Sequence, residues 1–426
     1  AAADAEEPAV RSPASSDGRR SPDWAWPRAS WRPQAFPGDG HSGLLESLDD
    51  ARRSPSSASR GRRTPSKDTA TPLALGRCLL AALERNGTAG RPGPDGAQKP
   101  TSPLEIRHFR PGEKIYDLYS WDKVLQEEGS GGKVVVCRPK LPADDDAPPG
   151  PSYVMKMKSK ADLREVHMEE AFRQTQVRVL NLRAHPNVVR MHEVLEDEKF
   201  FYVVMENVEG GALFDCLAND YQDGRVPQAA VREVMRDILC AVSHVHRHGM
   251  LHRDIKPDNI AMQAWPAEYL AGVGPSRRGR KWMPSKRAVL IDFDHADPAW
   301  NGCRSPGGHS DEIFGTLHFN APEAFRGIST VQSDLFSVGA VLYLLVTGTF
   351  PFHDEVYQGV ANWTGQGERN LIYQRLQAAT VDFPPGAWAE QPACQDLCQR
   401  LLAFSPSERP RSADEALRHP WFQGGA

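Results

Sequence analysis

The spacing of hydrophobic residues separates a polar N-terminal region from a longer region with regular apolar patterns. Residues 1–70 are rich in Pro, Ser, Ala, Gly and charge and show little hydrophobic period, which is typical of disorder. Residues 72–86 predict a short amphipathic helix, and a Gly/Pro-rich linker follows over 88–112. We therefore expect a disordered tail over 1–112, with order beginning near Tyr116.

Short apolar runs beyond the tail predict β-strands. Val124–Val136 is typical of two strands joined by a glycine turn, and a further apolar stretch surrounds Tyr153–Lys156. Phe200–Glu206 is rich in β-branched and aromatic residues, as buried strands are, and Ala288–Asp294 begins with another apolar run. The pattern thus predicts several strands separated by polar loops.

Two longer segments show the apolar period of helices. Lys160–Ala184 repeats apolar residues at helical spacing, and Pro227–Gly249 does so more strongly before it ends at a glycine. The residues expected on the buried face of the first helix include Val166, Phe172, Val179 and Leu180.

Composition narrows the classes of protein to consider. With 426 residues, 40% of them hydrophobic, the chain is long enough for one large two-lobed domain with a tail, or for two or three smaller domains. The net charge of −4 argues against a general nucleic-acid binder. No run of about 18 apolar residues occurs, so no transmembrane helix is expected. The seven cysteines are scattered without a C-x-x-C pair, which favours an intracellular location, cytoplasmic or nuclear, over a disulfide framework or a zinc site.

The most informative stretch is Leu251–Asn259, which reads L-H-R-D-I-K-P-D-N between a helical pattern and an apolar run. Its residue order resembles the catalytic loop of protein kinases, H-R-D-x-x-x-x-N. The resemblance implies that Asp254 accepts the proton of an attacking hydroxyl and that Lys256 neutralises the transferred phosphoryl group. It also implies that Asn259 holds a magnesium ion. A polar surface turn is the alternative, but it does not require this order of residues.

A second part of the resemblance concerns the phosphates of the nucleotide. Against the kinase pattern G-x-G-x-x-G-x-V, Glu127 replaces the first glycine, whereas Gly129, Gly132 and Val134 match. Glycines there allow backbone N–H groups to approach phosphates closely, and Glu127 would place a side chain near them. An ordinary hairpin turn would have the same appearance, so both interpretations stay open for this stretch alone.

The apolar strands resemble those that contact ATP in the family. The tetrapeptide Y-V-M-K resembles V-A-I-K, which implies that Lys156 bridges the α- and β-phosphates and that Val154 lies over the adenine. In the later strand, Met205 would stand behind the adenine. The backbones of Glu206 and Val208 would contact the base.

The helix after Lys156 departs from the family pattern. His185–Val189 (H-P-N-V-V) resembles the sequence that follows the regulatory helix in kinases of the calcium/calmodulin-dependent group. Counting back from it, Gln176 occupies the position that normally holds the glutamate paired with Lys156. Glu169 lies on the same helix face about 10 Å away at 1.5 Å per residue, so it would serve only if the helix slid. We expect Gln176 to stay in place beside Lys156.

The strand expected to bind metal carries a second departure. Ala288–Asp294 resembles the strand that ends in D-F-G, which implies that Asp292 holds magnesium and that Phe293 packs against His252. Asp294 replaces the glycine. Aspartate tolerates left-handed backbone angles better than most residues, so metal binding is compatible with it, while conformational switching is expected to be slower or biased.

The activation segment of the resemblance is His295–Glu323, which closes with an intact A-P-E. Thr316 is expected to bond both the catalytic aspartate and the lysine two residues after it, as in Ser/Thr-specific kinases. Ser305 and Ser310 are candidate phosphorylation sites, and Arg253 would pair with such a phosphate.

Two further matches concern structural support. Asp334 matches the buried aspartate that braces the catalytic-loop backbone of the family. Arg409 matches the arginine that pairs with Glu323, and loss of one side of such a buried ion pair is costly.

Two basic segments fall outside these motifs. Arg52–Lys67 in the tail contains Ser54 and Thr64, each followed by proline, and a basic insertion occupies 263–287. The tail segment is either a phosphorylated docking site for a partner or a solvated linker. The insertion is either a docking or localisation loop or a surface hairpin.

The resemblance covers 116–422 and implies a bilobal protein kinase fold of the α+β class. A small β-rich N-lobe with one regulatory helix would occupy 116–206, and a larger helical C-lobe would occupy 209–422. The implied activity is transfer of the γ-phosphate of ATP, with Mg²⁺, to Ser or Thr hydroxyls of protein substrates.

Two other hypotheses belong to different functional classes. Glu127, Gln176 and Asp294 support a pseudokinase scaffold, and the basic segments support a protein that acts mainly through partner binding. The groups that are hardest to replace are nevertheless present, which favours an active enzyme. These groups are Lys156, Asp254, Asn259 and Asp292.

Overall fold

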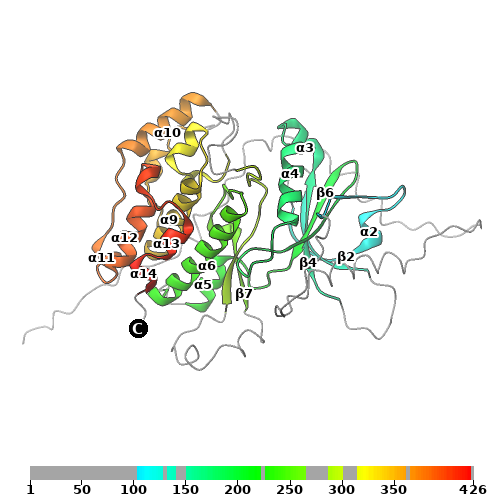
Figure 1. The fold of residues 1–426 in the computed structure, drawn as a ribbon, viewed down its shortest axis with the longest axis horizontal. Coiled ribbons are helices and arrows are strands. Elements are labelled where there is room, and N and C mark those ends of the chain that lie inside the picture. Colours follow the sequence, from blue (N-terminus) through cyan, green and yellow to red (C-terminus); the bar gives the residue numbers. More distant parts are fainter. Residues whose placement is uncertain are drawn as a thin grey trace, which may run out of the picture.

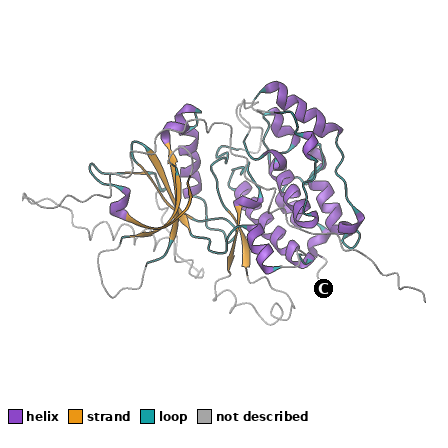
Figure 2. Cartoon of the chain, turned by 180° about the vertical axis from the view of Figure 1, so that it is seen from behind, coloured by secondary structure: helices purple, strands orange, loops and turns teal. Residues whose placement is uncertain are grey.

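The computed structural model describes residues 103–127, 132–140, 150–221, 226–264, 286–300, 314–360 and 365–423. Figure 1 shows two parts, a twisted sheet with helices against it and a mostly helical part beside them. The same division is seen from behind, coloured by secondary structure, in Figure 2. The predicted bilobal α+β architecture is therefore confirmed.

The N-lobe is built on a six-stranded sheet with the order β1-β5-β6-β4-β3-β2. Its strands are β1 (Arg107–His108), β2 (Tyr119–Glu127), β3 (Lys133–Pro139), β4 (Tyr153–Ser159), β5 (Met191–Glu196) and β6 (Phe200–Glu206). Neighbouring strands are antiparallel, except that β1 runs parallel to β5. In β4, Tyr153, Met155 and Met157 are buried in the core of this sheet. Because successive side chains of a strand alternate, Lys156 faces the other way.

Order begins earlier in the chain than the sequence predicted. Residues 103–112 belong to the N-lobe, because β1 pairs with the end of β5. The Leu104 backbone also exchanges two hydrogen bonds of 2.8 Å with the side chain of Asn181. The predicted tail over 1–112 is corrected accordingly, and the short helix α2 (Ile115–Leu118) follows this segment. A two-residue strand whose partner is distant in sequence has no local pattern that would indicate it.

The helix predicted over Lys160–Ala184 is in fact two helices, α3 (Lys160–Glu165) and α4 (Glu169–Leu180). The backbone turns between them at His167, whose φ of 55° is left-handed. Val166 lies in this turn and is 52% exposed, so its predicted burial is wrong. The other three predicted positions are buried, namely Phe172, Val179 and Leu180.

The C-lobe consists of helices around the buried α9 together with a two-stranded sheet. Its helices are α5 (Leu213–Asp220), α6 (Gln228–Arg247), α9 (Val331–Thr347), α10 (Gln366–Ala378), α11 (Pro385–Trp388), α12 (Pro392–Leu401), α13 (Ala413–Leu417) and α14 (Pro420–Gln423). The antiparallel strands are β7 (Ile260–Ala264) and β8 (Lys286–Leu290), with the 3₁₀ turn η2 (Pro257–Asn259) before them. Gly339 lets α9 and α12 approach closely, since a Cβ there would lie 2.7 Å from the Cβ of Leu401.

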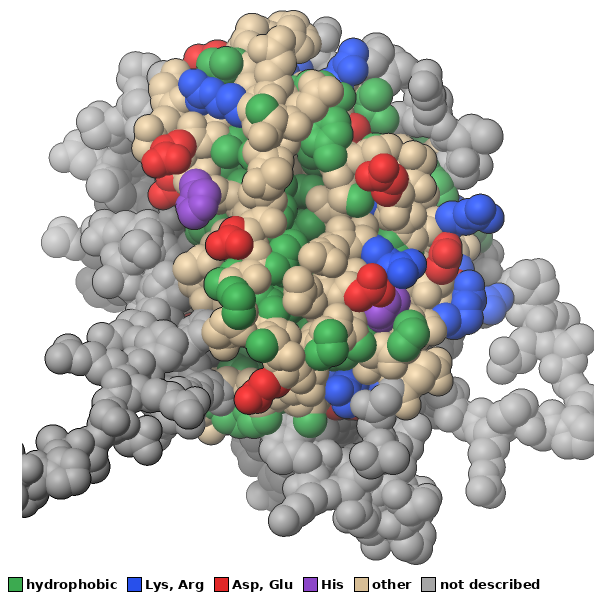
Figure 3. Space-filling model, turned by 90° about the vertical axis from the view of Figure 1, so that its left-hand side faces the viewer, with side chains coloured by type: hydrophobic (Ala, Val, Ile, Leu, Met, Phe, Trp, Pro, Cys, Tyr) green, Lys and Arg blue, Asp and Glu red, His purple; other side chains and the backbone are tan. Residues whose placement is uncertain are grey.

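Several predicted features lie outside the described residues. They are the tail over 1–102 with its helix at 72–86, Gly129, Ser305, Ser310 and positions 265–285 of the insertion. Within the described ranges, none of the helices has the length and apolar character needed to cross a membrane. On the end of the molecule formed by the C-lobe, described acidic and basic side chains are interspersed with apolar ones (Figure 3).

Candidate active site

The stretch Leu251–Asn259 leaves α6 and leads through η2 into β7. Because β7 pairs with β8, the end of β8 lies beside η2, and the N–H of Ile291 donates to the carbonyl of Asn259 at 2.9 Å. This backbone contact brings Asn259 close to Asp292, although the two residues lie far apart in the sequence.

Asp254 lies at the centre of a closed set of polar contacts. Its carboxylate accepts hydrogen bonds from Thr316 Oγ1 at 2.9 Å and from Asn259 Nδ2 at 2.8 Å, and Lys256 Nζ lies 2.9 Å away. Lys256 also donates to Thr316 Oγ1 at 2.8 Å, so both contacts expected of Thr316 are present. Asp254 is only 6% exposed. One cation and two further donors therefore compensate a carboxylate that has lost most of its water.

Asp334, on α9, supports the backbone of the catalytic loop. Its carboxylate accepts hydrogen bonds from the N–H groups of His252 and Arg253, each at 2.9 Å, and lies 2.8 Å from His246 Nε2. Burial alone would raise the pKa of Asp334, but the bond with His246 and the other donors outweigh burial and hold the pKa below its usual value. The same bonds hold Arg253 at a left-handed φ of 64°, which is an unfavourable backbone conformation for arginine.

The other predicted brace is a buried ion pair between Glu323 and Arg409. Two parallel hydrogen bonds of 2.7 and 2.9 Å join the guanidinium to the carboxylate. The remaining donors of Arg409 are used as well, by backbone carbonyls of Ala403, Gln332 and Phe404. The pair fixes the end of the expected activation segment against the C-lobe.

Arg253 is engaged by the activation segment itself. Its guanidinium lies over the ring of Phe314, 3.9 Å from the ring centre, and its Nε donates to the carbonyl of His295 at 2.6 Å. Both serines whose phosphates it was expected to bind lie outside the described residues, so that expectation stays a prediction.

Lys156 lies between two carboxylates that follow β8. Its Nζ is 3.1 Å from both oxygens of Asp292 and 2.7 Å from Oδ2 of Asp294. Burial would raise the pKa of Asp292, but the Lys156 ammonium opposes it and holds the pKa well below its usual range. Between the two aspartates, Phe293 is buried edge-on against His252 with ring centres 4.9 Å apart, as the sequence predicted. The left-handed residue of this segment is Asp292, with φ of 60°, and not Asp294.

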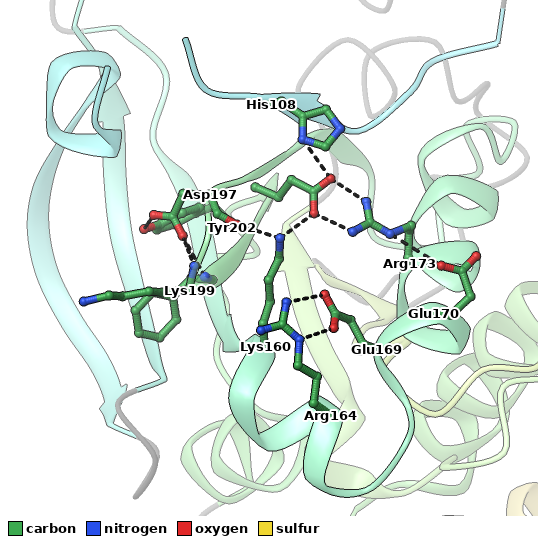
Figure 4. A network of polar contacts seen from close by, with 11 residues as sticks. His108, Lys160, Arg164, Glu169, Glu170, Arg173, Asp197, Lys199 and Tyr202 are labelled. Carbon is green, nitrogen blue, oxygen red and sulfur yellow. Dashed lines mark hydrogen bonds and ion pairs between the residues drawn. The ribbon is translucent and has the colours of Figure 1, made fainter. Parts of the chain in front are cut away.

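Of the two candidates for pairing with Lys156, Glu169 is bonded elsewhere and Gln176 carries no charge. Gln176 is on α4 and 1% exposed, and within the described residues its Nε2 has no hydrogen-bond partner. Glu169 forms two hydrogen bonds of 2.5 and 3.1 Å with Arg164, as Figure 4 shows. Sequence reasoning therefore missed Asp294 as the charged partner of Lys156. The available signal was the pair of departures itself, a carboxylate absent at Gln176 and one added at Asp294.

Comparison with known proteins supports this arrangement. Residues 128–422 match the protein kinase domain. The chain belongs to the protein kinase family. It is 30% identical over 247 residues, 58% of this chain and 57% of the relative, to serine/threonine-protein kinase PKZ1 of Phytophthora infestans. It is 28% identical over 304 residues, 70% of this chain and 48% of the relative, to calcium/calmodulin-dependent protein kinase type II subunit delta of Oryctolagus cuniculus. The chain thus spans about half the length of these curated relatives.

The strands of the kinase N-lobe place the other predicted nucleotide contacts side by side. Val134 on β3 is opposite Lys156 on β4, and Val154 is opposite Met205 on β6. The N–H of Glu206 is already bonded to the Arg190 carbonyl at 2.8 Å. Val208 is partly buried against the hydrophobic core, and Gly132 is buried just before β3. Glu127, which replaces the first glycine of the pattern, forms an exposed ion pair of 3.1 Å with Lys133. The lysine partly compensates the negative charge of Glu127.

Helix α4, which stands where the family has its regulatory helix, is tied to both lobes. Glu196, 1% exposed at the end of β5, accepts hydrogen bonds from Arg173 of α4, lies 2.7 Å from Lys160 Nζ of α3, and contacts His108 of β1 at 3.2 Å (Figure 4). Towards the C-lobe, Thr175 Oγ1 donates to the carbonyl of Ala296 at 3.2 Å. These contacts hold α4 beside the segment that contains both aspartates.

Proposed function

We propose that this chain is a Ser/Thr protein kinase that transfers the γ-phosphate of ATP to hydroxyl groups of protein substrates. The observation that carries the proposal is the closed set of contacts among Asp254, Lys256 and Thr316. It leaves a carboxylate beside an ammonium on a braced loop, which is the combination that hydroxyl phosphorylation requires. The kinase relatives support the same activity.

Asn259 and Asp292 are suited to hold Mg²⁺. The side-chain nitrogen of Asn259 is used in two hydrogen bonds of 2.8 Å to Asp254, so its amide oxygen is the atom left for a metal. Asp292 adds a carboxylate from the neighbouring segment. Amide and carboxylate oxygens are the hard ligands that Mg²⁺ prefers, so the donor set fits the ion. When bound, magnesium would supply charge neutralisation for the phosphates.

Each of the motif residues of the site would have a separate role in phosphoryl transfer. Lys156 binds phosphate oxygens of the nucleotide from the N-lobe. Asp254 orients the substrate hydroxyl and accepts its proton, while Lys256 compensates charge at the transferred group. Thr316 keeps those two side chains in register. Most of the rate enhancement would come from this positioning and from charge stabilisation.

A phosphotransfer assay with Mg-ATP and a generic Ser/Thr peptide tests the proposal. Asp254→Ala is expected to lower kcat by about 10²–10⁴-fold, because the hydroxyl loses its base. Glu390→Gln, an exposed change in the C-lobe, is the matched control and is expected to behave as wild type. Equal background activity in wild type and Asp254→Ala, with ATP still bound by both, would instead establish a pseudokinase.

The remaining expectations about partners and location stand as parts of the proposal. Free thiols at all the described cysteines support a reducing, cytoplasmic or nuclear location. The cysteines concerned are Cys137, Cys216, Cys240, Cys394 and Cys398.

Docking of partners on the basic tail and on the insertion is tested by crosslinking in cells with those segments deleted. Phosphosite mapping decides whether Ser54 and Thr64 are modified.

A further inference from the structure

Lys156 has a charged partner that the family pattern does not provide. Its Nζ is 2.7 Å from Asp294 Oδ2, closer than the 3.1 Å to each oxygen of Asp292. The side chains of Lys156 and Asp294 are each 13% exposed, so water screens this ion pair much less than it screens a surface pair. The attraction between these two groups is therefore strong enough to set where the ammonium lies.

The position on α4 where the family has a glutamate carries no charge in this chain. Gln176 occupies the inward position on α4, and its amide is neutral at every pH of interest. Compared with the family pattern, one carboxylate is absent at Gln176 and one is added at Asp294. The net charge around Lys156 is therefore the same, but its source has moved from α4 to the segment after β8.

We propose that Asp294 is the residue that positions Lys156 for the phosphates of ATP, in place of a carboxylate on α4. This inference rests on the proposed function, because it assigns a role within the same site. Asp292 is needed as a metal ligand, so it is not free to hold the lysine throughout turnover. Asp294 has no such second duty in the mechanism. Its Oδ2 also lies 3.6 Å from Lys158 Nζ, which is farther than the 2.7 Å to Lys156, so Lys156 is the nearer of its two cations.

The backbone around Asp294 is fixed well enough for this role. Its N–H donates to Asp292 Oδ1 at 3.3 Å, and the preceding Phe293 is buried. Two residues later, the carbonyl of Ala296 accepts the hydrogen bond from Thr175 of α4. Asp294 is thus held between two anchored neighbours, and its carboxylate reaches the lysine without any shift of the helix.

Two substitutions of Asp294 separate the effect of its charge from that of its backbone, and a third substitution tests a carboxylate on α4. Asp294→Gly restores the family residue, Asp294→Asn removes the charge but keeps the size, and Gln176→Glu returns a carboxylate to α4. The ATP dissociation constant is measured by calorimetry with and without Mg²⁺, beside kcat and KM for ATP. Glu198→Gln, an exposed change in the N-lobe, is the control and is expected to match wild type.

Both Asp294 variants are expected to weaken ATP binding by about tenfold, the effect of losing one hydrogen bond between charged groups. Gln176→Glu alone is expected to change the dissociation constant by less than about threefold, because the lysine already has a partner. Gln176→Glu combined with Asp294→Gly is expected to recover most of the loss. Wild-type affinity in Asp294→Asn, or no recovery in the double variant, would overturn the proposal.

A measurement on the nucleotide-free protein keeps this result separate from the question of catalysis. Lys156→Met and Asp294→Asn are compared singly and together by thermal unfolding. A directly interacting pair gives shifts in the unfolding midpoint that are not additive, whereas additive shifts would contradict the pairing. Non-additive shifts together with ATP affinities in the expected order would support the positioning role of Asp294. If wild type then transferred no phosphate, the proposed function would be wrong while the positioning role would still be supported.

Discussion

The catalytic loop of the C-lobe holds buried charges and the lysine site of the N-lobe holds partly buried ones, and the two differ in how these charges are supported. Asp254 and Asp334 are surrounded by backbone N–H groups, a histidine, a lysine, a threonine and an asparagine, all from the C-lobe or the activation segment. Lys156 depends instead on two carboxylates from another part of the chain. Substitution in a closed hydrogen-bond network is unfavourable, because the loss of one partner leaves a buried polar group without a hydrogen bond. An ion pair needs only a charge at the right place, and any nearby element can supply it.

This difference explains where the chain departs from its family. The motif residues of the catalytic loop are all retained, because each one bonds several others. The departures at Gln176 and Asp294 occur in the lysine site, where one charge replaces another. Substitutions at both kinds of site test this contrast.

Asp334→Ala is expected to lower the free energy of unfolding by about 3–5 kcal/mol and to abolish phosphotransfer. The N–H groups of His252 and Arg253 and the ring of His246 would all lose a buried acceptor. Urea unfolding measures the loss. Asp382→Ala, at an exposed carboxylate of the same lobe, is the control, and equal losses in both variants would contradict the bracing role.

Glu196→Gln is expected to lower the free energy of unfolding by about 2 kcal/mol. The loss is smaller than for Asp334→Ala, because the neutral amide still accepts some of the hydrogen bonds. Burial alone would raise the pKa of Glu196, but the hydrogen bonds from Arg173 and Lys160 outweigh burial and lower the pKa. The stabilisation is therefore present above the unfolded pKa and is lost as the pH falls through the lower folded value. Chemical denaturation at a series of pH values measures this stabilisation. Glu198→Gln, at a nearby exposed residue, is the control. A loss of stability that does not change with pH would show that the Glu196 carboxylate is not its source.

Asp237 shows that charge compensation is incomplete elsewhere in the C-lobe. Burial raises its pKa to about 6, although its carboxylate accepts the N–H of Ala288 at 2.9 Å. A raised folded pKa stabilises the protein fully below about pH 4, and this contribution is lost as the pH rises through about 6. Asp237→Asn keeps the acceptor and is expected to be about 1–2 kcal/mol more stable than wild type at pH 8 and equal to it at pH 4. A constant difference across that range would refute the assignment.

Glu169→Ala is expected to have the smallest effect, below about 1 kcal/mol in stability and without change in ATP affinity. Glu169 bonds Arg164 at the surface and takes no part in holding Lys156. Calorimetric titration with ATP is the decisive measurement. Weaker ATP binding in this variant would show that α4 moves to bring Glu169 to the lysine, against the role given to Asp294.

Much of the fold and of the catalytic loop could be predicted because the signals are local. The order of residues in Leu251–Asn259, the strand pattern of Phe200–Glu206 and the period of Pro227–Gly249 each depend on neighbours within about one element. The break at His167 and the exposure of Val166 were not predictable, because the apolar period continues through the turn.

Sequence alone was enough to find the residue order of a kinase catalytic loop, together with the lysine, asparagine and aspartate proposed to bind nucleotide and metal, because each of these motifs is a short local pattern. Tertiary structure alone decided that β1 joins the sheet and that Asp294 reaches Lys156. Both depend on contacts between residues that are distant in the chain, the first within the N-lobe sheet and the second between the two lobes. The site is therefore a family motif in the C-lobe combined with a lysine whose contact with Asp294 is established by the folded protein.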